Sequence, residues 1–203
     1  NGVGYRGAPS QNVVSQQVQP IRIVETIPAN TWKKINDSTY IFDFARNMSG
    51  VTRIKVSGEE GTVVKLKHGE RLYDNGRVNT SNIDVYHRPV DDSDPFQTDI
   101  LILSGKGEDE FMARFNYKGF RYVEVTSSKP IELQQNSLTA YFVHSDVPQK
   151  GEISTSNPLV NRLWWATNNA YLSNLMGYPT DCPQREKNGW TGDGHFAIET
   201  ALY

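Results

Sequence analysis

Three carboxylates, one arginine and one tryptophan fall within a short stretch near the C-terminus, residues 181–193, which read DCPQREKNGWTGD. One proline and two glycines in this stretch predict a loop, and catalytic groups concentrate on loops held by rigid elements. Like charges raise the cost of ionising one another, which suits a site that keeps one carboxyl group protonated and another ionised. Glycosidic bond cleavage needs this combination, because one carboxyl protonates the leaving oxygen while the other acts as base or nucleophile.

The loop offers a role for each of these side chains. Glu186 is the predicted proton donor, because Asp181 and Asp193 flank it and would favour its protonated form if all three converge. Asp193 would stay ionised at a helix N-terminus, where free N–H groups favour an anion. Trp190 presents a flat face suited to the C–H face of a sugar, and Arg185 could orient a carboxylate or donate to sugar hydroxyls.

A simpler interpretation is open on spacing alone. The same residues could be ordinary solvated charges, with Arg185 and Lys187 paired against Asp181 and Glu186. Charged loops are common, and clusters of titratable groups mark functional sites only as a tendency.

Two segments with helical apolar periodicity flank the loop. Ser156 and Asn157 offer N-cap oxygens and Pro158 suits a first helical position, which predicts a helix of about five turns. After the loop, Thr191 or Asp193 would cap a second helix. Helices with broad apolar faces cannot bury them alone, so we expect further helices as partners.

The chain from residue 21 to about residue 144 has a β pattern. Apolar, β-branched and aromatic residues alternate or run together between turn residues. The predicted strands are 21–24, 40–44, 52–56, 62–68, 99–103, 111–115, 120–125 and 138–143. Short strands without an intervening helix indicate an antiparallel β-sandwich of the jelly-roll type.

Changes in composition divide the chain into four parts. Residues 1–20 are predicted to be a lead-in from an upstream domain, 21–145 the β-sandwich, 146–155 a linker and 156–203 the start of a helical domain. The second helical run ends without a stop signal. We therefore expect a piece of a larger protein.

Composition excludes several classes of partner. The net charge is −2, and no polybasic run is present, so neither nucleic acid nor a membrane surface is a predicted partner. No apolar run is long enough to cross a bilayer. The lone Cys182 excludes an intramolecular disulfide and a multi-cysteine zinc site, and we interpret it as a small buried residue. The compartment is not indicated.

Other residues that could do chemistry have simpler structural interpretations. We expect His195 to pack or cap on its helix, and His68 with Glu70 to form a structural contact. Of the adjacent Trp164 and Trp165, at most one faces the core, and the other lines a barrel or a domain interface.

An acidic turn at Asp91, Asp92 and Asp94 invites a calcium interpretation. It lacks the EF-hand order with a central Gly and a terminal Glu, so a solvated turn is the prediction. We expect neither a metal nor a cofactor.

The loop 181–193 resembles the signature of bacterial α-L-rhamnosidases of glycoside hydrolase family 78, and the resemblance covers nearly everything after residue 21. Other segments similar to the family are 40–44, 47–50, 68–71 and 117–123 in its β-sandwich domain, and 156–161 at its first barrel helix. The resemblance implies a mainly β fold: an antiparallel, jelly-roll-like β-sandwich followed by the first helical hairpin of an incomplete (α/α)6 barrel.

The resemblance also implies an activity, the inverting hydrolysis of terminal α-L-rhamnosides without a metal. Glu186 then matches the general acid, Asp181 and Asp193 the residues that bind rhamnose hydroxyls, and Trp190 a wall of the sugar pocket. The family's base is a Glu much further along its barrel, and Glu199 lies too close to match it. The expected partners are a rhamnose-containing glycoside and the remaining barrel helices, and we expect these residues alone to be inactive.

Two alternatives from other functional classes are compatible with the sequence. Residues 21–145 could be a carbohydrate-binding module, or a structural module that supports a barrel and touches no ligand. A hydrolase of another deoxy sugar is also compatible, because Trp190 and the carboxylates do not distinguish a methyl from a hydroxymethyl group at C5.

Overall fold

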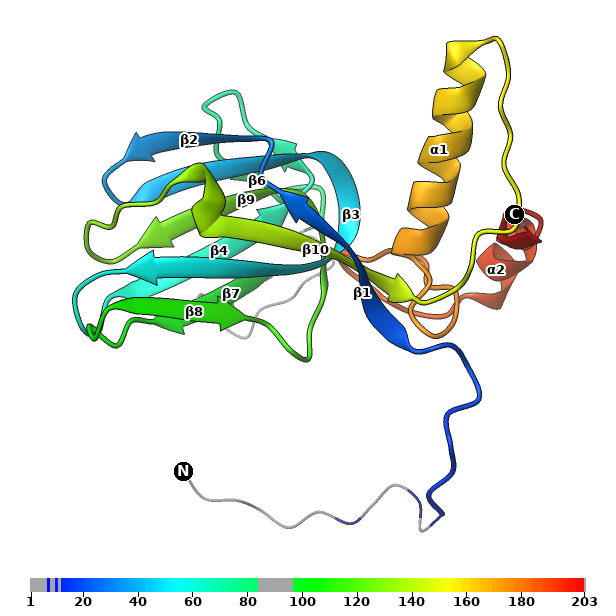
Figure 1. The fold of residues 1–203 in the computed structure, drawn as a ribbon, viewed down its shortest axis with the longest axis horizontal. Helices are drawn as coiled ribbons and strands as arrows, with labels where there is room; N and C mark the ends of the chain where they lie inside the picture. The colour runs from blue at the N-terminus through cyan, green and yellow to red at the C-terminus, as the bar shows by residue number, and fades with distance from the viewer. Residues whose placement is uncertain (1–6, 8–9, 11, 84–96, 203) are drawn as a thin grey trace.

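The computed structural model describes residues 7, 10, 12–83 and 97–202 (Figure 1). The strands are β1 (Ile21–Pro28), β2 (Thr31–Asn36), β3 (Thr39–Ser57), β4 (Val63–Gly69), β5 (Arg71–Leu72), β6 (Val78–Asn79), β7 (Thr98–Ile102), β8 (Glu108–Met112), β9 (Lys118–Ser127) and β10 (Leu138–Ser145). The helices are α1 (Pro158–Ser173), α2 (Thr191–Ala197) and two short 3-10 turns, η1 (Gln135–Ser137) and η2 (Thr200–Leu202). The predicted class, mainly β with helices at the C-terminal end, is confirmed. The acidic turn at Asp91, Asp92 and Asp94 lies outside the described residues.

All strand pairings in the described residues are antiparallel. The main sheet has the order β1-β10-β3-β9-β4-β7, and β2 and β8 also pair with β3, while β5 and β6 form a separate ribbon. β3 therefore pairs with strands in both halves of the fold. The start of β3 pairs with β2, and its end pairs with β10 and β8. The sheet curls around β3 and closes over a single core (Figure 1).

A bend divides β3 between these two sets of partners. Its register against β9 breaks between Asp43 and Met48, and Ala45 there has a φ of 57°. The strands predicted at 40–44 and 52–56 are thus one bent strand. Bulges of this kind increase local twist, which lets a single strand turn from one layer into the other.

The core is made of large apolar side chains that alternate along the strands. Phe120 is fully buried, with its ring edge-on to Phe44 at 5.9 Å and to His68 at 4.9 Å between centroids. The other side chains with no exposed surface in this core are Tyr40, Phe42, Ile54, Val64, Leu66, Val123, Val125, Leu133, Leu138 and Ala140. Burying a Phe or Leu side chain contributes about 1.5–3 kcal/mol, so this cluster is the main source of stability.

The strand predicted at 111–115 is wrong in its boundaries, because β8 runs from Glu108 to Met112. Gly105 and Gly107 adopt positive φ and turn the chain tightly after β7, so pairing with β3 starts earlier than predicted. Phe115 is fully exposed in the loop that follows. The sequence also gave no prediction for β2, which carries two lysines, or for the two-residue strands β5 and β6.

The helical end follows a long connection that runs from β10 to the far end of α1 (Figure 1). Pro158 is the first residue of α1, and the Asn157 Oδ1 accepts a hydrogen bond from the Leu159 N–H at 2.9 Å, so the predicted cap is confirmed. The predicted cap of α2 is wrong. Its N-cap is Trp190, which makes no capping hydrogen bond through its side chain, and Asp193 lies in the first turn. No helix in the described part of the chain has the length and apolarity to cross a membrane.

Candidate functional site

The loop between α1 and α2 is closed on itself by hydrogen bonds between Asp181 and Asn188. The Asp181 N–H donates to the Asn188 carbonyl and the Asn188 N–H donates to the Asp181 Oδ1, both at 3.0 Å. At the start of the loop, the Thr180 N–H donates to the Asn174 carbonyl at 2.7 Å, which ties it to the end of α1. These contacts fix the ends of residues 181–188 and hold the side chains between them close together.

Two carboxyl groups and one thiol meet inside this closed loop. The carboxylate oxygens of Asp181 and Glu186 and the sulfur of Cys182 all lie within 4.8 Å of one another. The Cys182 thiol donates to the Asp181 Oδ2 at 3.3 Å, and its side chain is buried as predicted. The sequence did not predict that this thiol belongs to the acidic cluster.

Asp181 is held in its ionised form. Partial burial acts to raise its pKa, but hydrogen bonds from the Asn188 N–H, the Cys182 thiol and the Glu186 carboxyl outweigh burial and hold the pKa below its ordinary value. A carboxylate that accepts several hydrogen bonds is stabilised as an anion. The pair thus provides an ionised carboxylate beside a second carboxyl group, which is an arrangement suited to proton transfer.

Arg185 contacts the second carboxyl group. Its Nε lies 3.4 Å from the Glu186 Oε1, and about 30% of each of the two side chains is exposed. This is one of the pairings expected for an ordinary charged loop. Lys187 does not follow that interpretation, because its ammonium group donates to the Tyr117 carbonyl and to the Asn116 side chain.

Three of the predicted site residues line one cavity. Asp181, Trp190 and Asp193 border a space of about 250 Å³ between α1 and α2, with Asn174 and Tyr171 on the α1 side. Trp190 is 52% exposed, so its ring is available to a ligand. Glu186 is not part of this lining and is linked to the cavity through Asp181.

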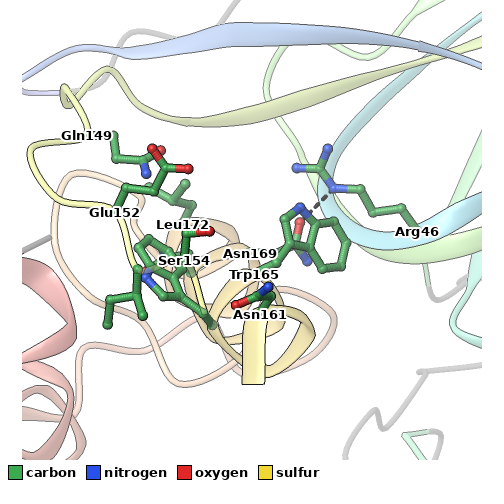
Figure 2. A pocket seen from close by; sticks show the side chains of 11 residues that line it. Arg46, Gln149, Glu152, Ser154, Asn161, Trp165, Asn169 and Leu172 are labelled. Atoms are coloured by element: carbon green, nitrogen blue, oxygen red, sulfur yellow. Dashed lines mark hydrogen bonds between the residues drawn. The ribbon is translucent and has the colours of Figure 1, made fainter. Parts of the chain in front are cut away.

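A second cavity, of about 340 Å³, separates α1 from the connection that precedes it and reaches the bend of β3 (Figure 2). The Arg46 Nε donates to the Asn169 Oδ1 at 2.6 Å, and its guanidinium group lies 5.6 Å from the Trp165 ring centroid. The Arg46 Nη1 also pairs with Glu25 at 2.6 Å. Trp165 therefore lies at the contact between the sheet and α1, which is one of the places expected for one member of the Trp164–Trp165 pair.

His68 and Glu70 both have structural contacts, but with different partners rather than with each other as predicted. The His68 ring contacts the Thr52 hydroxyl and the Gln97 carbonyl, and burial lowers the pKa of His68 to about 4. Glu70 accepts from Asn47 at 2.7 Å and from Gln184 at 3.3 Å, so it joins β3 to the loop. His195 is exposed and packs edge-on against the neighbouring Phe196 ring, with the centroids 5.6 Å apart.

Family models match almost the whole chain. Residues 33–144 match the bacterial alpha-L-rhamnosidase concanavalin-like domain, and residues 148–203 match the bacterial alpha-L-rhamnosidase 6 hairpin glycosidase domain. An alpha-L-rhamnosidase of Streptomyces avermitilis is 34% identical over 99% of the chain, and one of Formosa agariphila is 30% identical over 100% of it. The chain spans 19% and 21% of the lengths of these two relatives.

Solved structures give the same result. The alpha-L-rhamnosidase from Dictyoglumus thermophilum matches with a TM-score of 0.83 and 36% identity, over 93% of this chain and 20% of that one. The Streptomyces avermitilis alpha-L-rhamnosidase complexed with L-rhamnose matches with a TM-score of 0.82 and 34% identity, over 98% of this chain and 19% of that one.

Proposed function

This chain belongs to the bacterial α-L-rhamnosidase family, and we propose that it is part of an enzyme that hydrolyses terminal α-L-rhamnosyl residues with inversion at the anomeric carbon. The supporting observation is the contact between the Asp181 and Glu186 carboxyl groups beside a cavity that Asp181, Trp190 and Asp193 line together. Inverting hydrolysis needs a carboxyl group that donates a proton at the edge of a sugar site, and we propose Glu186 for that role.

In the proposed mechanism Glu186 donates the proton, and Asp181 stays ionised beside it. Asp181 is the better anion, because its hydrogen bonds from Asn188 and Cys182 stabilise the charge. Glu186 then protonates the glycosidic oxygen as the bond to the sugar breaks. A water molecule attacks the anomeric carbon from the opposite face, activated by a carboxylate from another part of the complete enzyme.

The cavity residues are proposed to bind the sugar. The carboxylates of Asp181 and Asp193 would accept hydrogen bonds from rhamnose hydroxyls, and the Trp190 ring would cover an apolar face of the sugar. Arg185, 3.4 Å from Glu186, would orient the acid. The L-rhamnose in the Streptomyces avermitilis structure favours this sugar over other deoxy sugars. The reaction as proposed requires no metal and no cofactor.

The domain organisation is also part of the proposal. Residues 21–145 form the β domain and residues 156–203 begin the catalytic barrel, with 146–155 as the linker and 1–20 as a lead-in from an upstream domain. Large apolar residues on α1 are exposed, Leu159 at 61% and Leu163 at 58%, and we propose that the remaining barrel helices cover them. These 203 residues alone would then have negligible turnover, because the acid lacks a closed pocket that excludes water.

Hydrolysis of an aryl α-L-rhamnoside tests the assignment of the acid. In the enzyme extended through the remaining barrel helices, Glu186→Gln is expected to lower kcat by about 10²–10⁴, the usual contribution of a general acid. Glu132→Gln is the matched control, because Glu132 pairs with Lys34 at the surface of the β domain. Near-normal turnover of Glu186→Gln would refute the assignment, and NMR detection of the anomer formed first would test inversion.

A further inference from the structure

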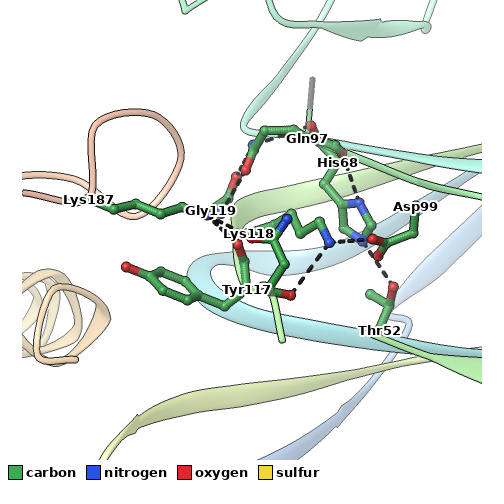
Figure 3. A network of polar contacts seen from close by, with 9 residues as sticks. Thr52, His68, Gln97, Asp99, Tyr117, Lys118, Gly119 and Lys187 are labelled. Atoms are coloured by element: carbon green, nitrogen blue, oxygen red, sulfur yellow. Dashed lines mark hydrogen bonds and ion pairs between the residues drawn. The ribbon is translucent and has the colours of Figure 1, made fainter. Parts of the chain in front are cut away.

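The residue after the proposed acid, Lys187, extends its side chain toward the β domain (Figure 3). The Lys187 Nζ donates to the Tyr117 carbonyl at 2.6 Å and to the Asn116 Oδ1 at 3.1 Å. The same ammonium group lies 4.4 Å from the centroid of the Tyr117 ring. Three contacts therefore tie one side chain of the loop to the two residues that precede β9.

The backbone at this position is unusual. Lys187 has a φ of 56°, in the left-handed region that glycine and asparagine adopt more readily than lysine. Such a conformation costs about 1–2 kcal/mol and persists only where surrounding contacts impose it. The bonds from the Lys187 side chain to residues 116 and 117 provide that constraint.

Keeping the Lys187 side chain charged in this partly buried position costs free energy. Burial and repulsion from Lys118 lower the pKa of Lys187 to about 8, with Asp99 and the Cys182 thiol acting in the opposite direction. A side chain that only filled space here would be more stable without a charge. At a pKa of about 8 the amine is still mostly protonated at neutral pH, so an ammonium group makes the two hydrogen bonds to residues 116 and 117.

The segment that receives Lys187 is itself rigid. The Lys118 side chain is almost completely buried and paired with Asp99. The Gln97 amide bonds both sides of Gly119, donating to its carbonyl at 2.8 Å and accepting from its N–H at 3.2 Å. Lys187 is thus bonded to two residues that directly precede a firmly held part of the sheet.

A second contact holds the loop on the other side of the acid. A Cβ atom at Gly119 would lie 2.9 Å from atoms of both Pro183 and Gln184, so only glycine permits the observed approach. The Gln184 side chain is also bonded to Glu70. The loop therefore contacts the β domain at residues 183–184, two residues before Glu186, and at the residue after it.

We propose that Lys187 is a positioning residue for the proton donor, and that residues 116–119 of the β domain are the template that fixes where the Glu186 carboxyl group lies. The inference rests on the proposed role of Glu186 as the acid. Lys187 does not touch the sugar; it acts by holding the backbone of its neighbour. The β domain then contributes to catalysis through the accuracy of proton donation.

The test compares substrates with poor and good leaving groups in the complete enzyme. Lys187→Asn keeps a residue that tolerates the left-handed backbone but cannot reach Tyr117. With an alkyl α-L-rhamnoside, which needs protonation, we expect kcat to fall by about 30- to 100-fold with little change in KM. With a dinitrophenyl α-L-rhamnoside, whose leaving group departs without a proton, we expect a loss of less than about threefold.

Two further variants keep the test decisive. Lys129→Asn is the matched control, because Lys129 forms an ion pair with Glu59 beyond the other end of β9, and it should leave both rates unchanged. If Lys187→Asn does not fold, Asn116→Ala removes one of the two acceptors of Lys187 and should reproduce the same selectivity at about three- to tenfold. Equal losses with both leaving groups, or no loss, would overturn the inference.

The same substrates separate this inference from the proposed function. Glu186→Gln must itself discriminate between the alkyl and the dinitrophenyl substrate. If it does not, the assignment of the acid fails. If it does and Lys187→Asn does not, the acid stands and only its positioning by Lys187 is refuted.

Discussion

The β domain and the helical end bury their apolar side chains to different extents. In the sheet, Phe42, Leu66 and Phe120 have no exposed surface. In the helices, Leu163 is 58% exposed and Phe196 is 88% exposed. Burial of apolar surface is the dominant favourable term in folding, so the β domain holds its own stabilising core and the helices do not.

The proposed catalytic loop lies in the less buried helical end, but contacts with the more buried β domain fix its conformation. Lys187 is bonded to the Tyr117 carbonyl, Gln184 to Glu70, and Gly119 admits the loop backbone. A loop held by a rigid scaffold can keep functional groups in a fixed geometry. The β domain can therefore hold the proposed site in place even though the helices beside it are only partly covered.

The largest expected effect tests whether the β core carries the stability. Phe120→Ala removes a fully buried ring and should lower the free energy of unfolding by about 3–5 kcal/mol, because a cavity remains. Phe115→Ala is the matched control, since the Phe115 ring is fully exposed in the loop before β9, and it should change stability by less than about 0.5 kcal/mol. Urea unfolding measures both. Equal effects would contradict a core centred on Phe120.

The second prediction concerns the stability of the β domain at acidic pH. Burial, together with Lys118 and against Asp99, lowers the pKa of His68 to about 4 from its ordinary 6.5. Between these values the unfolded chain binds a proton that the folded chain does not, so stability falls as the pH falls from about 6.5 to about 4. The loss approaches roughly 3 kcal/mol over this range.

Unfolding free energies measured across the same pH range check this prediction. His68→Gln should remove most of the slope, while His195→Gln, at an exposed residue, should leave the slope unchanged. A slope that persists in His68→Gln would assign the acid sensitivity to other groups.

Local chemistry made parts of the fold predictable from sequence. Alternating apolar residues indicated most strands, and the Asn157 cap before Pro158 fixed the start of α1. The bend of β3 could not be predicted, because Ala45 adopts a left-handed conformation that alanine does not favour. The boundaries of β8 depend on a glycine turn and on pairing with the end of β3, which an apolar pattern does not encode.

The site was predictable to a similar extent. The type and spacing of residues in the loop anticipated that Asp181 would lie beside Glu186. Asp193 was expected beside Glu186 as well, but it lines the cavity with Trp190 and is not part of the acidic cluster. The attachment of Lys187 could not be foreseen. Its partner is a main-chain carbonyl 70 residues earlier, and any residue type can supply a carbonyl. Tertiary pairing alone brings these two segments together.

A smaller expected effect tests how stable the helical end is independently of the β domain. Asn157→Ala removes the side-chain acceptor of the Leu159 N–H and should destabilise α1 by about 1 kcal/mol. Asn157→Asp keeps an acceptor at the N-cap and should be nearly neutral. Helical circular dichroism during urea unfolding measures the change. A loss as large as that of Phe120→Ala would contradict a purely local role of this cap.

The smallest expected effect in this chain separates the two regions most directly. Leu163→Ala should change the free energy of unfolding of the 203 residues by less than about 0.5 kcal/mol, because the side chain is largely exposed. In the enzyme extended through the remaining barrel helices, the same change should cost about 2–5 kcal/mol if those helices cover it. Leu66→Ala, in the core of the sheet, should cost that amount in both proteins. If Leu163→Ala is neutral in both proteins, the remaining barrel helices do not cover Leu163. The exposed face of α1 would then contact another part of the enzyme or a partner.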